Sequence, residues 1–176
     1  MFSPFTIASV ALLIPLAVII TYTDVRYRRI PNKYVLIALI SGLTLNTIFG
    51  GFHGLLASVG GCLLAFALML ILHVFGAMGA GDVKLFAAVG AILGFKLVLP
   101  TFAIVLVTGF ALALYSMFRA RVASQTMLRV LQFFVGLLPG WQLPRFTVLA
   151  TDRRHTIPYG VAITLGSLIS LLVFRS

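Results

Sequence analysis

Two aspartates, Asp24 and Asp82, are the residues of this sequence with the clearest capacity for chemistry. The 176-residue chain has only 3 acidic residues against 13 Lys and Arg, and these two stand at polar breaks between long apolar runs. A pair of carboxyl groups that shares one proton can activate water for peptide hydrolysis, one as ionised general base and one as protonated general acid. Because like charges about 3 Å apart cannot both ionise, such a pair requires an intermediate pH.

The elements that must position these carboxyl groups are membrane helices. Hydrophobic residues make up 61% of the chain and charged residues 9%, whereas the apolar share of a soluble globular domain is roughly 45–50%. A helix needs about 20 apolar residues to cross the hydrocarbon of a bilayer, and only helices satisfy their own backbone there without closing a barrel. Five apolar runs approach that length, namely 5–22, 34–49, 55–75, 101–118 and 157–174, and the run 85–100, which Lys96 interrupts, could be a sixth span or a half-span that leans on its neighbours. The sequence predicts an all-α integral membrane protein, with about six transmembrane helices in one bundle that forms a single domain over 1–176.

The basic residues predict the orientation of this bundle. Eleven of the 13 Lys and Arg fall in 24–33, beside Asp82, or in 119–154, and Lys96 and Arg175 are the exceptions. Because cytoplasmic loops of membrane proteins are enriched in Lys and Arg, we expect these segments in the cytoplasm, and the N-terminus, the 50–53 turn and the C-terminus outside. The net charge of +10 is then a topology signal and not a sign of nucleic-acid binding. Residues 119–155 are predicted to form a cytoplasmic loop with an amphipathic segment.

Crossing parity places the two aspartates on the same side of the membrane. Asp24 follows the first apolar run, Asp82 follows the third, and two crossings separate them. Structural alternatives exist for each residue. Asp24 could pair with Arg28 at i,i+4 spacing, and Asp82 could cap a helix that runs onward from Val83.

The residues around the aspartates predict how the site is shaped. Gly79 and Gly81, like the preceding Gly76, leave room for a substrate backbone beside Asp82, although glycine also serves close packing of membrane helices. Pro31 ends the segment after Asp24, and Asn32 can cap the second span. The cation of Lys84 could favour the ionised member of the pair, but its helical position turns it to a different face from Asp82.

Together these motifs resemble the type IV prepilin peptidases, which are membrane aspartic peptidases of the GxGD type. The resemblance rests on Asp24 followed after five residues by Ile30-Pro31-Asn32, and on Gly79-Ala80-Gly81-Asp82 continuing into Val83-Lys84-Leu85. It extends over 21–118, and Ile157-Pro158-Tyr159-Gly160 also looks like the start of the family's last helix. The resemblance implies that Asp24 and Asp82 are the catalytic pair, that no metal or other cofactor takes part, and that the partner is a prepilin or pseudopilin precursor. Its short basic leader would be removed at the cytoplasmic face of the inner membrane.

The chain departs from the larger members of that family. Those members carry a cytoplasmic insertion with paired cysteines and also N-methylate the new terminus, whereas Cys62 is the only cysteine here. We therefore do not expect methyltransferase activity. The compact size resembles the branch that serves tight-adherence or Flp-type pili, and archaeal preflagellin peptidases share the same plan. The identity of the pilin and the oligomeric state are open at this point.

A function of another class is also compatible with the sequence. A small transporter or a non-enzymatic assembly component could use Asp24 and Asp82 as proton-relay or packing groups. No pair of runs shows the repeat symmetry typical of transporters. The aspartates also lie at the edges of their runs, whereas a relay group is expected near mid-span.

Overall fold

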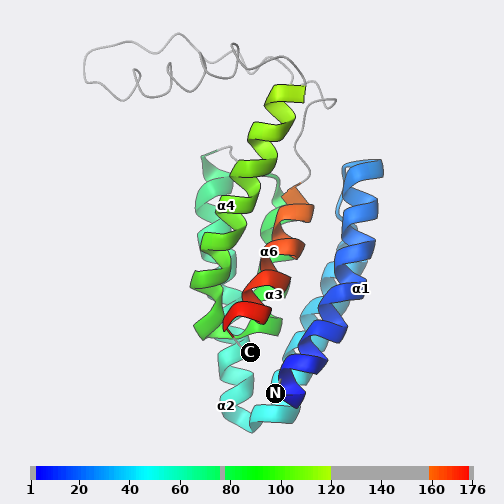
Figure 1. Cartoon of the computed structure of the whole chain (residues 1–176). Coiled ribbons are helices and arrows are strands. Elements are labelled where there is room, and N and C mark those ends of the chain that lie inside the picture. The colour runs from blue at the N-terminus through cyan, green and yellow to red at the C-terminus, as the bar shows by residue number, and fades with distance from the viewer. Residues whose placement is uncertain (1–2, 76–77, 120–158, 175–176) are drawn as a thin grey trace, which may run out of the picture. The chain divides into compact units, whose positions relative to one another are not determined.

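A computed structural model describes residues 3–75, 78–119 and 159–174 of the chain, and every element in these ranges is a helix (Figure 1). The predicted all-α class is confirmed for the described residues. By their contacts the residues form two compact units, Met1–Gly109 with Pro158–Ser176, and Phe110–Ile157, and the first unit holds both aspartates. The predicted loop at 119–155 falls almost wholly outside the described residues, so it stays a prediction. The elements are α1 (Pro4–Tyr27), α2 (Asn32–Val74), α3 (Ala80–Leu93), α4 (Phe95–Arg119) and α6 (Tyr159–Phe174).

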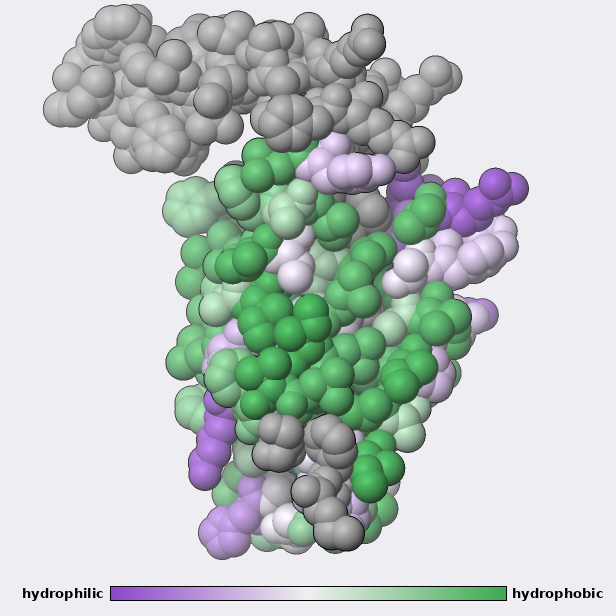
Figure 2. Space-filling view, in the orientation of Figure 1, coloured by the Kyte–Doolittle hydropathy of each residue, from purple (hydrophilic) through white to green (hydrophobic). Residues whose placement is uncertain are grey.

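The helices have the length and surface of membrane-spanning elements. Three described segments are long and apolar enough to cross a bilayer, namely Pro4–Tyr27, Asn32–Val74 and Phe95–Tyr115, and α6 is a shorter apolar helix. Large hydrophobic side chains such as Val18 and Phe52 are exposed. Figure 2 shows hydrophobic residues across the middle of one face and hydrophilic residues gathered toward its ends. The membrane class is therefore confirmed, whereas the number of crossings stays a prediction.

Helix α1 buries a single stripe of its surface, and Asp24 is the last residue of that stripe. The helix begins after Ser3, whose side chain accepts a hydrogen bond from the Thr6 N–H, and it ends at Arg28 in the left-handed conformation. The buried positions recur every three or four residues, as one helical face requires: Thr6, Ser9, Leu13, Leu16, Ala17, Ile20 and Asp24. The same periodicity that packs the apolar part of α1 thus carries the carboxyl group of Asp24 into the interior.

Helix α2 consists of two arms that meet at a break. Gly51 has φ 57° and ψ −141°, which lies outside helical geometry and which glycine adopts without a steric penalty. Without that break, 43 residues of helix would be about 65 Å long, roughly twice the hydrocarbon thickness of a bilayer. The turn predicted at 50–53 therefore lies where the sequence indicated. The apolar runs on either side of this turn form the two arms of α2.

The predicted run over 85–100 has other bounds in the structure, because the chain changes direction inside it. Gly94 has φ 77°, so α3 ends at Leu93 and α4 begins at Phe95, with Pro100 inside α4 instead of closing the run. Hydropathy is uniform across this turn, and a window of apolar residues could not detect it. Every residue from Leu85 to Leu93 is buried, which makes α3 a central helix enclosed by protein.

Polar side chains from α2 fix the end of α3. The buried Asn46 amide donates to the carbonyl oxygens of Ala91 at 2.9 Å and Ile92 at 3.1 Å, and Ser58 Oγ donates to the Ala91 oxygen at 2.6 Å. The last carbonyls of a helix have no partners within the helix, so these side chains satisfy groups that would otherwise be buried unpaired. The two arms of α2 therefore hold α3 in place from its C-terminal end.

Helix α6 completes the bundle through contacts with other helices. It packs against α1 and α3, and Thr101 on α4 donates to Ser170 on α6 at 2.6 Å. In Figure 1 the last turn of α1, which contains Asp24, and the first turn of α6 lie at the same end of the bundle. The start of α3 joins them there, because it carries Asp82 into electrostatic reach of Asp24.

Candidate active site

Asp24 and Asp82, which are 58 positions apart in the sequence, come within electrostatic reach of each other in the fold. The negative charge of Asp24 raises the pKa of the Asp82 carboxyl group, an effect second to that of burial. Asp24 belongs to the last turn of α1, and Asp82 is the third residue of α3. The end of one helix thus meets the start of another at this pair.

The carboxyl group of Asp24 is buried and held by a main-chain donor from α6. Its side chain is 8% exposed, and its Oδ2 accepts a hydrogen bond from the Gly160 N–H at 2.8 Å. The guanidinium of Arg28 also acts on this carboxyl group electrostatically, as the i,i+4 spacing predicts. Burial opposes ionisation of the carboxyl group, whereas the main-chain N–H and the nearby cation both favour the ionised form. Burial is the largest of these effects, and the main-chain N–H and the cation offset it in part.

The carboxyl group of Asp82 has a different environment. Burial, and to a smaller extent the charge of Asp24, raise its pKa from the ordinary value of 3.8 to about 6, and a hydrogen bond from the Gly79 N–H at 3.2 Å opposes both effects. That hydrogen bond caps α3, but the helix begins at Ala80 and not at Val83 as predicted. A carboxyl group has two oxygens, so a capping bond leaves it able to exchange a proton. Asp82 thus keeps its proton to a higher pH than an ordinary aspartate does.

The predicted glycines contact the site in different ways. At Gly81 a Cβ atom would lie 3.4 Å from the Ile30 Cβ atom, so this position brings α3 against the segment between α1 and α2. At Gly79 a Cβ atom would lie 3.2 Å from Asp82 Oδ2, which places the Gly79 main chain directly against the carboxyl group. Gly76 lies outside the described residues.

Of three further predicted residues, Pro31, Asn32 and Lys84, the last two connect α2 to α3. Asn32 does not cap α2 as predicted, because Pro31 occupies the N-cap position and the helix start has no side-chain capping bond. The Asn32 Oδ1 atom instead accepts a long hydrogen bond of 3.5 Å from Lys84 Nζ. Lys84 therefore reaches across to α2, in line with the expectation that it turns away from Asp82.

The start of α6 contributes two residues, Tyr159 and Gly160, whose roles the sequence alone did not indicate. Gly160 binds Asp24, and Tyr159 interacts electrostatically with Asp82. The only signal in the sequence was the phrase Ile157-Pro158-Tyr159-Gly160 at the head of the last apolar run, because a helix that begins near the polar edge of the bundle brings its first N–H groups there. Of the described residues, no three His, Cys, Asp or Glu side chains gather as metal ligands would.

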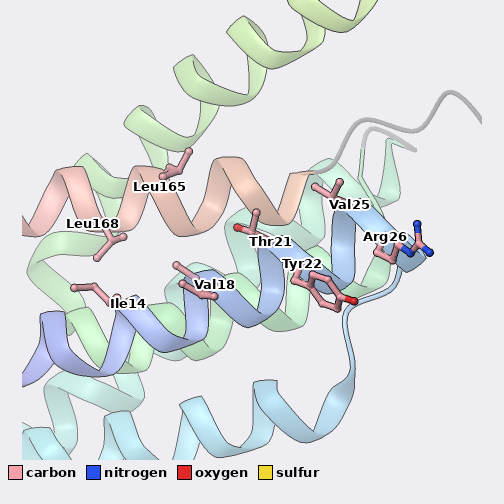
Figure 3. Close-up of a pocket in the computed structure, with 9 residues that line it drawn as sticks. Ile14, Val18, Thr21, Tyr22, Val25, Arg26, Leu165 and Leu168 are labelled. Carbon is pink, nitrogen blue, oxygen red and sulfur yellow. The ribbon is translucent and has the colours of Figure 1, made fainter.

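An apolar groove runs along the outside of α1 and α6 and reaches the turn that holds Asp24. Its volume is about 780 Å³, and its lining is apolar except at one end (Figure 3). The residues at that end are Thr21, Tyr22 and Arg26, within one helical turn of Asp24. The apolar part is lined by Ile14, Ala17, Val18, Val25, Leu165 and Leu168. Such a surface suits an apolar chain whose polar end lies near the aspartates.

Comparisons with known proteins place this geometry in a family. Residues 11–114, which include both aspartates, match the family described as the Type IV leader peptidase family. A segment of 92 residues is 33% identical to the "Prepilin leader peptidase/N-methyltransferase" of Bacillus subtilis (strain 168). That segment is 51% of this chain and 36% of the relative, so the match spans about a third of the relative's length. No solved structure matches the chain.

Proposed function

We propose, on the premise that this chain belongs to the Type IV leader peptidase family, that it is a membrane aspartic peptidase with Asp24 and Asp82 as its catalytic pair. The observation that carries the proposal is the electrostatic coupling of two carboxyl groups in different surroundings, one held by a main-chain donor and one with a pKa of about 6. Two titratable groups whose environments differ in this way can divide the acid and base roles of one reaction. The substrate class follows from the family, and it is a prepilin or pseudopilin precursor.

The chemistry that we assign to the pair is the hydrolysis of one peptide bond without a covalent intermediate. Asp24, as the general base, takes a proton from water, and the resulting hydroxide attacks the scissile carbonyl carbon. Asp82, as the general acid, gives its proton to the carbonyl oxygen. When the tetrahedral intermediate breaks down, Asp24 gives the proton that it took from water to the leaving amine, and Asp82 takes a proton from a hydroxyl of the intermediate as the new carbonyl forms, so both groups return to their starting states.

We place this site at the cytoplasmic face of the inner membrane. The arrangement that supports this topology has six crossings: α1, the two arms of α2, α3, α4 and α6. With 14 residues α3 is about 21 Å long and shorter than the hydrocarbon layer, but a short helix is tolerated where protein surrounds it. In this topology Lys84 and the basic residues after Asp24 face the cytoplasm, in agreement with the positive-inside rule. The N-terminus lies outside.

The groove along α1 and α6 is where we expect the apolar segment of the precursor. Prepilin-like precursors have a short basic leader followed by an apolar helix, and the cut falls between the two. The groove is arranged in the matching order, because its apolar lining leads to polar residues within one helical turn of Asp24. An apolar helix lying in the groove would therefore bring the junction with its leader to the aspartates.

A substitution that fills the groove tests this placement. Val18 is 64% exposed and lines the groove, so Val18→Trp would occupy the space without disturbing the core. We expect a higher KM for a prepilin-like peptide with little change in kcat. Leu36→Trp is the matched control, because Leu36 is 56% exposed on α2 and is not part of the groove lining. Equal KM values for the two variants would contradict the placement.

The short segment between α1 and α2 and the cysteine content support peptidase activity alone. The curated relative combines a peptidase and an N-methyltransferase in its name, and the match covers about a third of its length. The segment that joins α1 to α2 is short, and Cys62 is the only cysteine, so the paired-cysteine insertion of the larger family members is not present in this sequence. We therefore propose a peptidase without methyltransferase activity, similar to the branch that serves tight-adherence or Flp-type pili.

The alternative function is a transporter or assembly component that uses the aspartates as relay or packing groups. The two functions differ in whether the protein cleaves a precursor, and the peptidase should do so in a pH-dependent way. For the peptidase we expect purified protein to cut a prepilin-like peptide after its leader, with a rate that falls as pH rises through about 6, where Asp82 loses its proton. The product masses identify the bond. A protein that leaves a panel of such precursors intact across the acidic and neutral pH range would favour the alternative.

A further inference from the structure

Gly160 is the residue through which α6 reaches the carboxyl group of Asp24. The helix begins at Tyr159, so Gly160 occupies the second helical position. The N–H groups of the first turn have no acceptor within their own helix and are available to other partners. The Gly160 N–H donates to Asp24 Oδ2 at 2.8 Å, a short contact between buried groups from opposite ends of the sequence.

The neighbouring side chains leave no room for a Cβ atom at position 160. A Cβ atom at residue 160 would lie 2.8 Å from Asp24 Oδ2 and 3.0 Å from Ile20 Cγ2. The first distance is too short for a carbon atom and a carboxyl oxygen, so either the carboxyl group or the helix would have to move. The positive φ angles of the described residues occur elsewhere, so close approach and not backbone conformation explains the glycine.

The neighbouring residue ties the same turn to the other aspartate. Tyr159 interacts electrostatically with Asp82, and its ring lies close to Gly109 on α4, where a Cβ atom would be 3.2 Å from Tyr159 Cε1. The first two residues of α6 therefore interact with one aspartate each, Gly160 by a hydrogen bond and Tyr159 electrostatically. Among the described residues, the charged and titratable groups that interact with the pair are Arg28, which follows the last residue of α1, and Tyr159 on α6.

We propose that Gly160 is a positioning residue for the peptidase reaction. Its N–H holds the carboxylate of Asp24 ionised and oriented toward Asp82, and its missing side chain lets the start of α6 approach the pair. This inference rests on the proposed function, because it assigns Gly160 a role through Asp24 and not through the substrate.

Replacing the donor without adding atoms is the sharpest test. Glycolic acid in place of Gly160, introduced by suppression of a nonsense codon, converts the N–H into an ester oxygen and adds no side chain. Because the N–H of the second helical residue has no partner within the helix, the helix itself loses no hydrogen bond. We expect cleavage of a prepilin-like peptide to slow by on the order of tenfold, the size of one hydrogen bond to a charged group. We also expect the acidic limb of the pH–rate profile to move up by about one unit, because the Asp24 anion has lost a donor.

A pair of alanine substitutions separates positioning from packing. Gly160→Ala places its Cβ atom against Asp24, whereas Gly166→Ala, on the same helix, places one 2.8 Å from Val105 Cγ2 and away from both aspartates. Both changes crowd α6 to a similar degree, so we expect both to lower the thermal stability of the protein. We expect only Gly160→Ala to lower kcat by a hundredfold or more in the folded fraction.

The outcomes distinguish this inference from the function on which it rests. If the wild-type protein does not cleave the peptide, the proposed function fails and Gly160 has no reaction to position. If the wild-type protein cleaves but the ester variant keeps the same rate and pH profile, the inference is wrong while the function stands. Equal losses of kcat in Gly160→Ala and Gly166→Ala would also overturn it.

Discussion

Replacing Asp82 by asparagine is expected to stabilise the folded protein at neutral pH. The pKa of Asp82 rises from 3.8 to about 6 in the fold, mainly because the carboxyl group is removed from water and also because Asp24 lies near it. One unit of pKa corresponds to about 1.4 kcal/mol, so keeping Asp82 ionised in the fold costs about 3 kcal/mol. Asparagine carries no charge, and its side-chain oxygen can still accept the hydrogen bond from the Gly79 N–H.

The sign of this effect depends on pH in a defined way. A carboxyl group with a raised pKa binds its proton more tightly in the folded state, so folding stability falls as pH rises from 3.8 to about 6 and is lowest above that range. We expect Asp82→Asn and the wild-type protein to have similar unfolding free energies at about pH 4. At about pH 8 the variant should be more stable by about 3 kcal/mol.

Unfolding by SDS in mixed micelles, followed by far-ultraviolet circular dichroism below, at and above the raised pKa of Asp82, measures this difference. Asp152→Asn is the control, because it removes the remaining acidic residue of the sequence and leaves Asp24 and Asp82 in place. A difference between Asp82→Asn and the wild type that does not change over this pH range would refute the reasoning. A variant that is destabilised at the alkaline end would do so as well.

Three other substitutions test the packing and the charges around the site. Asn46→Ala should lower the unfolding free energy by about 2–4 kcal/mol in the same SDS assay, because the buried carbonyls of Ala91 and Ile92 lose the Asn46 donor and Ala91 keeps only that of Ser58. Thr44→Ala, at an exposed position, should change it by less than about 0.5 kcal/mol. Gly61→Ala should abolish folding, because its Cβ atom would collide with a carbonyl oxygen of α3. The adjacent Gly60→Ala should fold, because its Cβ atom would meet only a side chain, at 3.4 Å. Size-exclusion chromatography of each variant measures the outcome. Arg28→Gln should move the acidic limb of the pH–rate profile up by a few tenths of a unit at low salt and by less at high salt, since Arg28 is exposed; an unchanged profile would remove it from the tuning of the pair.

The sequence predicted those features of the fold that depend on composition and periodicity. The membrane class and the all-helical structure follow from apolar runs, and the break between the two arms of α2 lies at Gly51, where a turn was expected. Crossing parity predicted that Asp24 and Asp82 lie on the same side of the membrane, and in the structure the charge of Asp24 acts on Asp82. Their catalytic role stays a prediction.

The features that the sequence did not predict depend on single contacts between distant segments. Hydropathy is the same on both sides of Gly94, so only the backbone conformation reveals that the run at 85–100 contains a turn. Asn46 gives no sequence signal of its own, because the carbonyls that it binds belong to a helix more than forty residues away. Gly160 is one of 16 glycines in the chain, and its contact with Asp24 spans 136 positions. Such contacts exist only once the helices have packed.

The most direct test of the two-aspartate mechanism is cleavage of a prepilin-like precursor by purified protein in detergent. The wild-type protein is compared with Asp24→Asn and Asp82→Asn variants that show the same helical content and elute at the same volume. We predict that the wild type removes the leader and that neither variant does, since each lacks one of the two groups that exchange protons with water and the carbonyl oxygen. Leader removal at the wild-type rate by either variant would contradict the mechanism.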